Sequence, residues 1–414
     1  MKKFELVIVG GGVTAAHAIK AHREAGGDGR IALVGSETEL PYHRPPLSKR
    51  YLRGEADADD TRVETERFYR EQDIELVLGA EVVELVVGDK TVVTRDAQRL
   101  GYEKLLLASG SSPRTLDVAG ADLPGVFTLR SLGDAAAIRH AAAETRDAVV
   151  VGSGFIGMEV AASLTILGLD VTLVSRDTNL FGQLRSPEIS EHLLEVYRHH
   201  GVDIIRGDEV QAFRGHSRLD SVELHIGDPL GAHLAVVGVG VQPNTSFLAG
   251  SGVALDDGVV VNERFETNIP DVYAAGDVAR FFDPVFGRAR RIEHWSNAAY
   301  QGTEVGKVLA GVDGGYDTVS TFFTESFGLT LKIFGDVSQH DDRIARGSVA
   351  DGKAIVFYLE GARLVGTLHA GQDKATEHAL ENLIRSRATP DLGLLVDETI
   401  PLERAFADAD LICA

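Results

Sequence analysis

The sequence predicts an α/β protein in which two similar parallel-sheet domains are followed by a smaller α+β domain. Two observations support the paired domains: a β-branched run, a glycine-rich turn and a helical pattern follow one another at residues 6–24, and the same order recurs at residues 149–167. The pattern changes after Asp317, where short strand-like runs and one helix-like stretch follow an aromatic-rich segment. A chain of 414 residues is also too long for a single core.

Composition limits the classes of function. The hydrophobic share of 44% and the charged share of 25% are ordinary for a globular protein. A formal net charge of −21 argues against nucleic acid and anionic membrane surfaces as partners, and an acidic protein partner would need a local basic patch. No apolar run reaches the length of a transmembrane helix, about 18 residues or more. We therefore expect a cytoplasmic protein.

Cysteine usage excludes a further class of chemistry. Cys413 is the single cysteine of the sequence, so neither an intrachain disulfide nor a catalytic dithiol pair can form. This fits a reducing compartment. We interpret Cys413 as an incidental thiol near the end of the sequence.

The first glycine loop is of the kind that holds a dinucleotide pyrophosphate. Residues 6–9 are predicted as a buried parallel strand and residues 16–24 as a helix. Between them, Gly10 permits a tight turn, Gly12 lets backbone approach phosphate, and the small Ala15 lets helix and strand pack closely. The free N–H groups of the helix start would face the phosphates. A glycine turn in another α/β protein is the alternative.

The segment after the second predicted strand, residues 31–34, could hold a ribose and a charged group. An acidic residue at this strand end is expected to bind ribose hydroxyls, and Glu37, helped by Ser36, stands there. A surface carboxylate is the alternative.

Residues 40–50 carry three prolines, which predict a stiff segment whose cations, Arg44 among them, could fix a charged group. A rigid connector with solvated cations is the alternative.

The second glycine loop repeats the first. Residues 149–151 are predicted as a strand and residues 158–167 as a helix, separated by a complete loop. Its residues are Gly152, Ser153, Gly154, Phe155, Ile156 and Gly157. Because two such loops each lie between a strand and a helix, coincidence is a poor explanation, and the sequence predicts two Rossmann-like domains with one dinucleotide each.

The residues after the next predicted strand, 171–174, bear on the choice of coenzyme. A site for NAD would carry an acid there, but Ser175 and Arg176 follow the strand. An arginine attracts a 2′-phosphate, so NADPH is slightly favoured over NADH. Asp177 stands close by, and a one-residue shift of the strand end would change which residue takes the place of the acid. Use of both NADH and NADPH therefore stays open.

The remaining patterns set the domain boundaries. Strands are predicted at 74–78, 80–87, 90–93, 102–108, 202–205, 209–213, 221–225 and 235–239, and helices at 67–72, 188–200 and 299–309. Residues 111–113 are predicted as a turn, and residues 238–244 resemble residues 108–113 and suit a crossing back into the first domain. The predicted domains are residues 1–110 with 240–316, residues 111–239, and residues 317–414.

One further strand end carries a candidate binding residue. Residues 272–274 are predicted as a strand that leads to Ala275, Gly276 and Asp277. An aspartate there can accept a hydrogen bond from a ribityl hydroxyl while the next N–H groups face a pyrophosphate. A helix N-cap is the alternative, and the two roles are compatible.

Four motifs together resemble a known family. They are Pro45-Pro46-Leu47-Ser48-Lys49, Gly154-Phe155-Ile156-Gly157-Met158-Glu159, Ala275-Gly276-Asp277 and Trp295-Ser296-Asn297-Ala298. They resemble the FAD-containing NAD(P)H:ferredoxin reductases of oxygenase and cytochrome P450 systems, the putidaredoxin reductase and biphenyl dioxygenase reductase type, within the glutathione reductase fold group. The resemblance weakens after Asp317.

The resemblance implies a set of site residues. FAD would lie on the first loop near Gly12, Thr14 and Ala15, and Lys49 and the backbone of Trp295 would lie beside the flavin. Glu159 would lie near Lys49 and the nicotinamide, and these two are the catalytic candidates. Taken with the motifs, the candidate cofactor-binding residues are Gly10, Gly12, Thr14, Ala15, Ser36, Glu37, Arg44, Lys49, Val82, Ala108, Arg130, Gly152, Gly154, Phe155, Ile156, Gly157, Glu159, Ser175, Arg176, Gly240, Gly276, Asp277 and Trp295. No metal ligand is expected.

The resemblance also implies an activity. NAD(P)H would pass hydride to FAD, and the flavin would pass single electrons to a ferredoxin-type iron–sulfur protein in a transient complex. A fixed Lys49 ammonium would stabilise the charge of reduced flavin, and Glu159 would keep Lys49 charged and oriented; a purely structural ion pair is the alternative. The competing activities are NAD(P)H oxidase, quinone or monodehydroascorbate reductase, and a redox sensor like apoptosis-inducing factor. A monomer or a homodimer is expected.

The sequence departs from the family pattern at three places in the site. Ser36 stands where relatives often have aspartate, and Ser175 replaces the usual acid of NADH users. Phe322-Phe323-Thr324-Glu325 occupies a place where many relatives carry tryptophan. Partner docking and nicotinamide contacts are therefore the parts that the resemblance predicts least.

Overall fold

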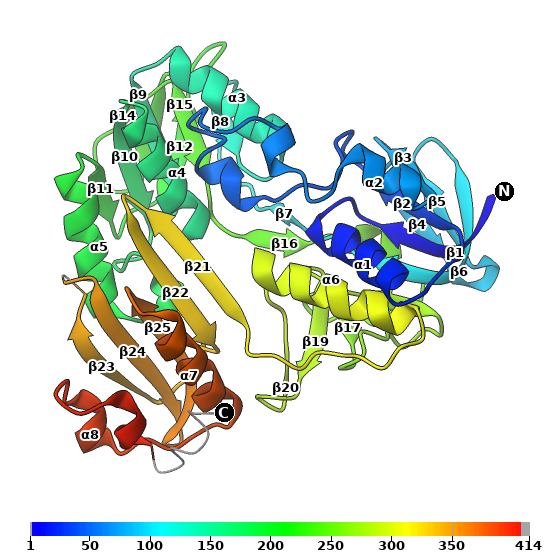
Figure 1. Ribbon diagram of the computed structural model, residues 1–414. Helices are drawn as coiled ribbons and strands as arrows, with labels where there is room; N and C mark the ends of the chain where they lie inside the picture. Colours follow the sequence, from blue (N-terminus) through cyan, green and yellow to red (C-terminus); the bar gives the residue numbers. More distant parts are fainter. Residues whose placement is uncertain (1, 350, 407–414) are drawn as a thin grey trace. The chain divides into compact units, whose positions relative to one another are not determined.

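The computed structural model describes residues 2–349 and 351–406, which form two compact units (Figure 1). The first unit contains the chain up to residue 44 together with residues 58–112 and 241–318. The second contains residues 45–57, 113–240 and the chain from residue 319 onward. Cys413 lies outside the described residues.

The first unit is built on a seven-stranded sheet. Five of its strands pair in parallel: β3 (Ile74–Leu78), β2 (Ile31–Gly35), β1 (Lys2–Val9), β6 (Arg99–Leu107) and β18 (Val272–Ala274). Two antiparallel strands extend the other side of β6: β5 (Thr91–Thr94) and β4 (Val82–Val86). The centre of β1 is fully buried, which is why its residues are consecutively apolar instead of alternating.

Helices and a small sheet complete this unit. They are α1 (Val13–Glu24), α2 (Glu66–Glu71), α6 (Trp295–Leu309), β16 (Val241–Pro243), β17 (Val259–Val261), β19 (Ala279–Asp283) and β20 (Arg288–Arg290). Helices α1 and α6 pack closely because two glycines of α6 face α1. A Cβ atom at Gly302 would lie 2.5 Å from the Thr14 carbonyl oxygen, and one at Gly306 would lie 2.4 Å from that of Ala18.

The second unit contains a five-stranded parallel sheet in the order β11-β10-β9-β15-β8. The strands are β8 (Val126–Thr128), β9 (Asp147–Val151), β10 (Asp170–Ser175), β11 (Asp203–Arg206) and β15 (Leu234–Val237). Its helices are α3 (Leu132–Ala143), α4 (Phe155–Ile166) and α5 (Pro187–His199). An antiparallel sheet of β12 (Val210–Arg214), β13 (Ser221–Leu224) and β14 (Leu230–Gly231) accompanies them.

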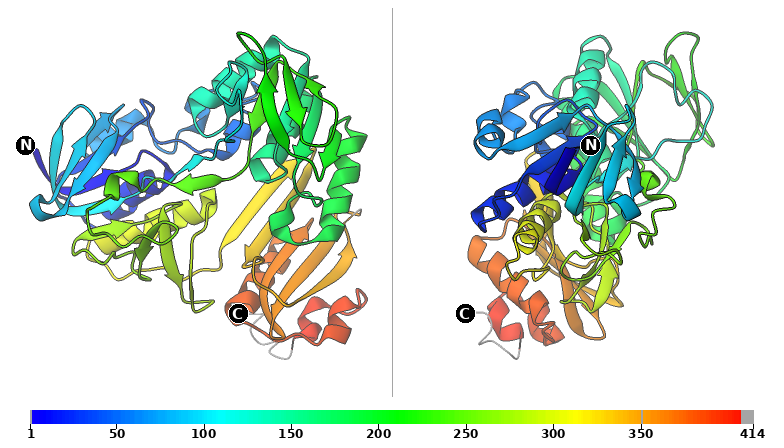
Figure 2. Two further views of the ribbon diagram at one scale, coloured as in Figure 1. Left: turned by 180° about the vertical axis from the view of Figure 1, so that it is seen from behind. Right: turned by 90° about the vertical axis from the view of Figure 1, so that its right-hand side faces the viewer.

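The same unit includes a C-terminal antiparallel sheet in the order β21-β22-β25-β24-β23. Its strands are β21 (Thr321–Ser326), β22 (Leu329–Gly335), β23 (Asp342–Ser348), β24 (Lys353–Glu360) and β25 (Arg363–Ala370). Helix α7 (Lys374–Arg385) lies along one face of this sheet, as Figure 2 shows, and α8 (Leu392–Val396) packs on β23.

The predicted α/β fold class, with two parallel sheets and a C-terminal α+β part, is confirmed. Local predictions were wrong at one turn and at three helix starts. Residues 111–113 form strand β7 (Ser111–Pro113), not a turn, because β7 and β16 pair as a two-stranded sheet. Helices α1, α4 and α6 begin three or four residues earlier than predicted, because the residues after each N-cap already form the first helical turn. The domain boundaries stay a prediction.

Candidate functional site

The first glycine loop connects β1 to α1. Gly10 has a φ of +121°, and a Cβ atom there would lie 2.0 Å from the Ala108 carbonyl oxygen, so only glycine fits. Gly12 is the N-cap of α1, and a Cβ atom there would meet nothing within 4 Å. The fold itself therefore needs Gly10 but not Gly12. Open space at a helix start without a side-chain cap is what a bound anion requires.

The second glycine loop connects β9 to α4 and has the same construction. Gly152 has a φ of +105°, and a Cβ atom there would lie 2.4 Å from the Gly238 carbonyl oxygen. A Cβ atom at Gly157 would lie 1.9 Å from the Gly152 carbonyl oxygen, so this glycine lets α4 pack on its own loop. Gly154 is the N-cap of α4 and has only the distant Gln183 amide near its Cβ position, at 3.7 Å.

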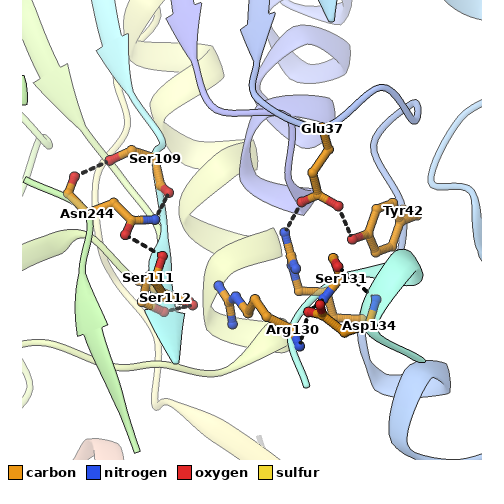
Figure 3. A network of polar contacts seen from close by, with 11 residues as sticks. Glu37, Tyr42, Ser109, Ser111, Ser112, Arg130, Ser131, Asp134 and Asn244 are labelled. Carbon is orange, nitrogen blue, oxygen red and sulfur yellow. Dashed lines mark hydrogen bonds and ion pairs between the residues drawn. The ribbon is translucent and has the colours of Figure 1, made fainter. Parts of the chain in front are cut away.

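The starts of α1 and α4 differ from the side-chain-capped starts of α3 and α7, although α5 also begins without a side-chain cap. Ser131 caps α3 through a capping box with Asp134, which Figure 3 shows, and Asp373 caps α7 with its carboxylate. Helices α1 and α4 instead have glycine N-caps, Gly12 and Gly154, so within the described residues no cap side chain accepts from the free N–H groups of their first turns. Both helix starts therefore fit the pyrophosphate of a dinucleotide.

Side chains near the second loop are partly apolar. Phe155, the first residue of α4, packs edge-on against Phe181 at 5.2 Å between ring centroids. Ile156 is 39% exposed. The loop therefore presents apolar surface beside its N–H groups.

The segment after β2 holds Glu37 in place. Its carboxylate accepts a hydrogen bond from the Tyr42 hydroxyl and pairs with the Arg44 guanidinium at 2.9 Å (Figure 3). Ser36 is exposed. The stiff segment thus fixes the carboxylate that the sequence assigns to ribose binding.

The corresponding segment after β10 has no such carboxylate fixed in place. Val151 pairs with Val174 as Val9 pairs with Val34, so Arg176 corresponds to Ser36 and Asp177 to Glu37. Strand β10 continues through Ser175, whose buried hydroxyl lies 2.7 Å from the Ser153 hydroxyl of the glycine loop. The Arg176 side chain is exposed and has no ion-pair partner within the described part of the chain.

The turn after β18 is locked to α1 and α6. Gly276 has a φ of +81°, and its N–H donates to the Gln301 side chain at 2.8 Å. A Cβ atom at Gly276 would lie 2.4 Å from the Thr14 hydroxyl oxygen, which itself donates to the Ala298 carbonyl. The Asp277 carboxylate accepts a hydrogen bond from the Ser111 hydroxyl at 3.0 Å.

Trp295, at the start of α6, is held by a histidine. Its indole N–H donates to Nδ1 of His43 at 2.9 Å, and the two rings meet edge-on with centroids 5.4 Å apart. An indole nitrogen only donates, so Nδ1 of His43 is the unprotonated nitrogen. Burial lowers the pKa of His43, which favours this neutral ring.

A buried charged pair lies in the second unit. The Lys49 ammonium and the Glu159 Oε2 atom are 2.5 Å apart, with side chains 12% and 5% exposed. The Ser48 hydroxyl donates to the same oxygen, and the Thr324 hydroxyl donates to Oε1 at 2.9 Å. Ser48 and Thr324 are not among the site residues predicted from the sequence, although Ser48 lies in one of the four family motifs and Thr324 lies in a departure from the family pattern.

The other candidates occupy strand ends and loops within their own units. Val82 begins β4, and Ala108 follows β6 with its N–H donating to the Val9 carbonyl. The Arg130 N–H donates to Asp134 beside the α3 cap (Figure 3). Gly240 has a φ of +103° and accepts a hydrogen bond from the N–H of Arg114.

The described residues contain no group of three or more His, Cys, Asp or Glu side chains arranged to hold a metal ion. Within the same residues, every helix is too short or too polar to cross a membrane.

Comparisons with known proteins agree on one family. The family model described as pyridine nucleotide-disulphide oxidoreductase matches residues 4–302, and the reductase C-terminal model matches residues 321–406. Putidaredoxin reductase of Pseudomonas putida is 32% identical over 98% of this chain and 97% of its own length. The ferredoxin reductase subunit of 5,5′-dehydrodivanillate O-demethylase of Sphingobium sp. is 33% identical over 99% and 97%.

A solved structure is similar over the whole length. In the covalent putidaredoxin reductase–putidaredoxin complex, the matched chain gives a TM-score of 0.92 with 32% sequence identity, over 98% of both chains.

Proposed function

The chain belongs to the pyridine nucleotide-disulphide oxidoreductase family, and from this premise we propose that it is a FAD-dependent NAD(P)H:ferredoxin reductase. It would take electrons from a reduced pyridine nucleotide and pass them to a ferredoxin-type iron–sulfur protein of an oxygenase or cytochrome P450 system. The resemblance to ferredoxin reductases inferred from the motifs is confirmed over nearly the whole chain. With one cysteine in the sequence, a dithiol relay is not available to this member.

One observation carries the proposal. Helix α4 begins at the second glycine loop and carries Glu159 one turn later, where the carboxylate meets Lys49 at 2.5 Å. A single helix therefore joins the predicted nucleotide-binding loop to a buried charged pair.

The bound FAD and pyridine nucleotide supply the hydride and electron chemistry, and the protein supplies binding, orientation and electrostatics. The α1 start at Gly12 suits the pyrophosphate of FAD, with Asp277 near a ribityl hydroxyl. The α4 start at Gly154 suits the pyrophosphate of the pyridine nucleotide. Glu159 holds the Lys49 ammonium in one position, and a fixed ammonium stabilises negative charge that develops beside it.

NADPH is the preferred coenzyme in this proposal. At the end of β10, a serine hydrogen-bonded to Ser153 stands where an acid would repel a 2′-phosphate. The exposed Arg176 guanidinium beside it supplies a positive charge for that phosphate. Asp177, which corresponds in register to Glu37, is the feature that would favour NADH.

We also propose a domain organisation, a cellular location and an oligomeric state. The FAD domain would comprise residues 1–110 and 240–316, the NAD(P) domain residues 111–239, and the C-terminal domain residues 317–414. A cytoplasmic monomer or homodimer is proposed. A chain with one cysteine fits a reducing compartment, and light scattering of the purified protein would give the oligomeric state.

The test is purification followed by an absorbance scan during titration with NADH and with NADPH. We expect a flavin spectrum, bleaching by NADPH at lower concentration than by NADH, and fast reduction of cytochrome c through an added ferredoxin. A protein without flavin that FAD cannot reconstitute would overturn the proposal. A persistent long-wavelength band with slow turnover would indicate a redox sensor, and rapid peroxide formation an oxidase.

A further inference from the structure

We infer that Thr324, on the first strand of the C-terminal sheet, is a positioning residue for the Lys49–Glu159 pair. The inference rests on the proposed function, because it assigns to the C-terminal domain a part in flavin reduction by NADPH. It goes beyond that function because it makes the C-terminal domain part of the site where the flavin is reduced.

The hydrogen bonds of Glu159 divide between its two oxygens. Oε2 receives the Lys49 ammonium and the Ser48 hydroxyl, each at 2.5 Å, and Oε1 receives the Thr324 hydroxyl at 2.9 Å. A buried carboxylate is held in one orientation when both of its oxygens accept hydrogen bonds. Thr324 therefore fixes the rotation of the carboxylate, and this rotation keeps Oε2 directed at Lys49.

Strand β21 is well placed to hold this hydroxyl. It is an edge strand that packs against α4, and Thr324 pairs with Leu331 of β22 and is 2% exposed. Phe322, on the same face of the strand, meets the ring of Phe155 edge-on at 6.2 Å, so the strand is tied to the start of α4. Phe323 lies with its ring centre 5.9 Å from the Lys49 ammonium. Three consecutive residues of β21 thus contact α4 or the charged pair.

The test compares Thr324→Val, which keeps the shape and removes the donor, with Thr324→Ser, which keeps the donor. Thr330→Val on β22 is the matched control, since Thr330 pairs with Glu325 on the same sheet. In the FAD-loaded protein we expect Thr324→Val to slow flavin reduction at saturating NADPH by about tenfold, the effect of one hydrogen bond to a charged group. The NADPH dissociation constant should not change, and Thr324→Ser and Thr330→Val should behave as wild type.

Two further measurements separate positioning from packing. The equilibrium midpoint potential of the bound flavin should become more negative in Thr324→Val, because a less fixed ammonium stabilises reduced flavin less. In a Glu159→Gln background, Thr324→Val should slow reduction no further, since the hydroxyl acts through the carboxylate. If Thr324→Val does not fold, Thr324→Ala serves in the same series.

An equal slowing in the Glu159→Gln background, or a changed melting temperature with unchanged reduction rate and potential, would overturn the inference. Failure of the proposed function would be seen in the wild-type protein itself. That protein would then lack flavin, or NADPH would not reduce its flavin, whatever the variants do.

Discussion

The Lys49–Glu159 contact is the residue-scale feature on which the proposed chemistry depends. An ammonium in this setting has few orientations, because its partner carboxylate is buried and takes hydrogen bonds from Ser48 and Thr324. Buried pairs are weak evidence for stability, because desolvation offsets much of their attraction. Their value here is a charge that stays in one place.

Replacing Lys49 tests that role. We expect Lys49→Met to retain FAD but to be reduced by NADPH about 100-fold more slowly, the size of effect seen when one preorganised electrostatic group is removed. Stopped-flow absorbance at saturating NADPH measures it. Lys2→Met is the control, because the Lys2 ammonium pairs with Glu75 on an exposed surface. Unchanged reduction in Lys49→Met would leave the pair with a structural role only.

A second residue, His369, predicts how stability depends on pH. It is buried in the C-terminal sheet, and burial together with the positive charge of Lys332 lowers its pKa to about 4. Glu377 lies 3.9 Å from its ring but is already paired with Lys332 at 2.6 Å, so this carboxylate does little to favour a charged ring.

The folded protein binds a proton at His369 less readily than the unfolded chain, whose histidine has a pKa near 6.5. Stability from this residue is therefore complete above pH 6.5 and falls as the pH drops toward 4, by about 3 kcal/mol in total. Urea unfolding between these pH values should show a shallower loss for His369→Phe than for wild type. The exposed His378→Gln should keep the wild-type slope, and equal slopes for all three proteins would contradict the assignment.

At the scale of elements, the two glycine-started helices predict separable binding defects. Gly12 and Gly154 both have φ values that alanine adopts, −94° and −83°, and neither Cβ position is crowded. Each alanine variant should fold, at a cost of about 1 kcal/mol or less for the changed N-cap.

Gly12→Ala should lose FAD, and Gly154→Ala should retain FAD but bind NADPH about tenfold more weakly, because a methyl group then occupies the space of a phosphate. Flavin content by absorbance and NADPH affinity by calorimetry distinguish the two. Both variants losing the same ligand would show that the loops do not serve different nucleotides.

The two helices also show what could be predicted from the sequence. Gly10 and Gly157 belong to the regular glycine spacing of the two loops, so the sequence indicated these positions, but the approach of Gly10 to the Ala108 carbonyl joins distant segments and could not be foreseen. Strand β7 was predicted as a turn because its pairing with β16 joins segments far apart in the sequence. Thr324 was not selected for a similar reason: 165 residues separate it from Glu159, and a threonine in a strand carries no motif. The roles of all the site residues stay predictions.

At the scale of the whole molecule, the candidate residues divide between the two units. Gly12, Glu37 and Asp277, assigned to FAD, lie in the first unit, and Gly154 and Arg176, assigned to the pyridine nucleotide, lie in the second. A ligand that binds only the folded form slows the opening of the region it contacts by mass action. Each nucleotide should therefore protect a different set of backbone amides.

Hydrogen exchange followed by mass spectrometry tests this division. Adding FAD to the apoprotein should slow exchange at residues 10–16 and 275–279, and adding NADP⁺ to the FAD-loaded protein should slow it at residues 152–158 and 175–178. Gly154→Ala should weaken the second protection and keep the first, which makes it the internal control. Two outcomes would contradict one nucleotide per unit: protection of both glycine loops by FAD alone, or protection of residues 10–16 by NADP⁺ in the apoprotein. In either case a nucleotide would bind at the helix start assigned to the other nucleotide.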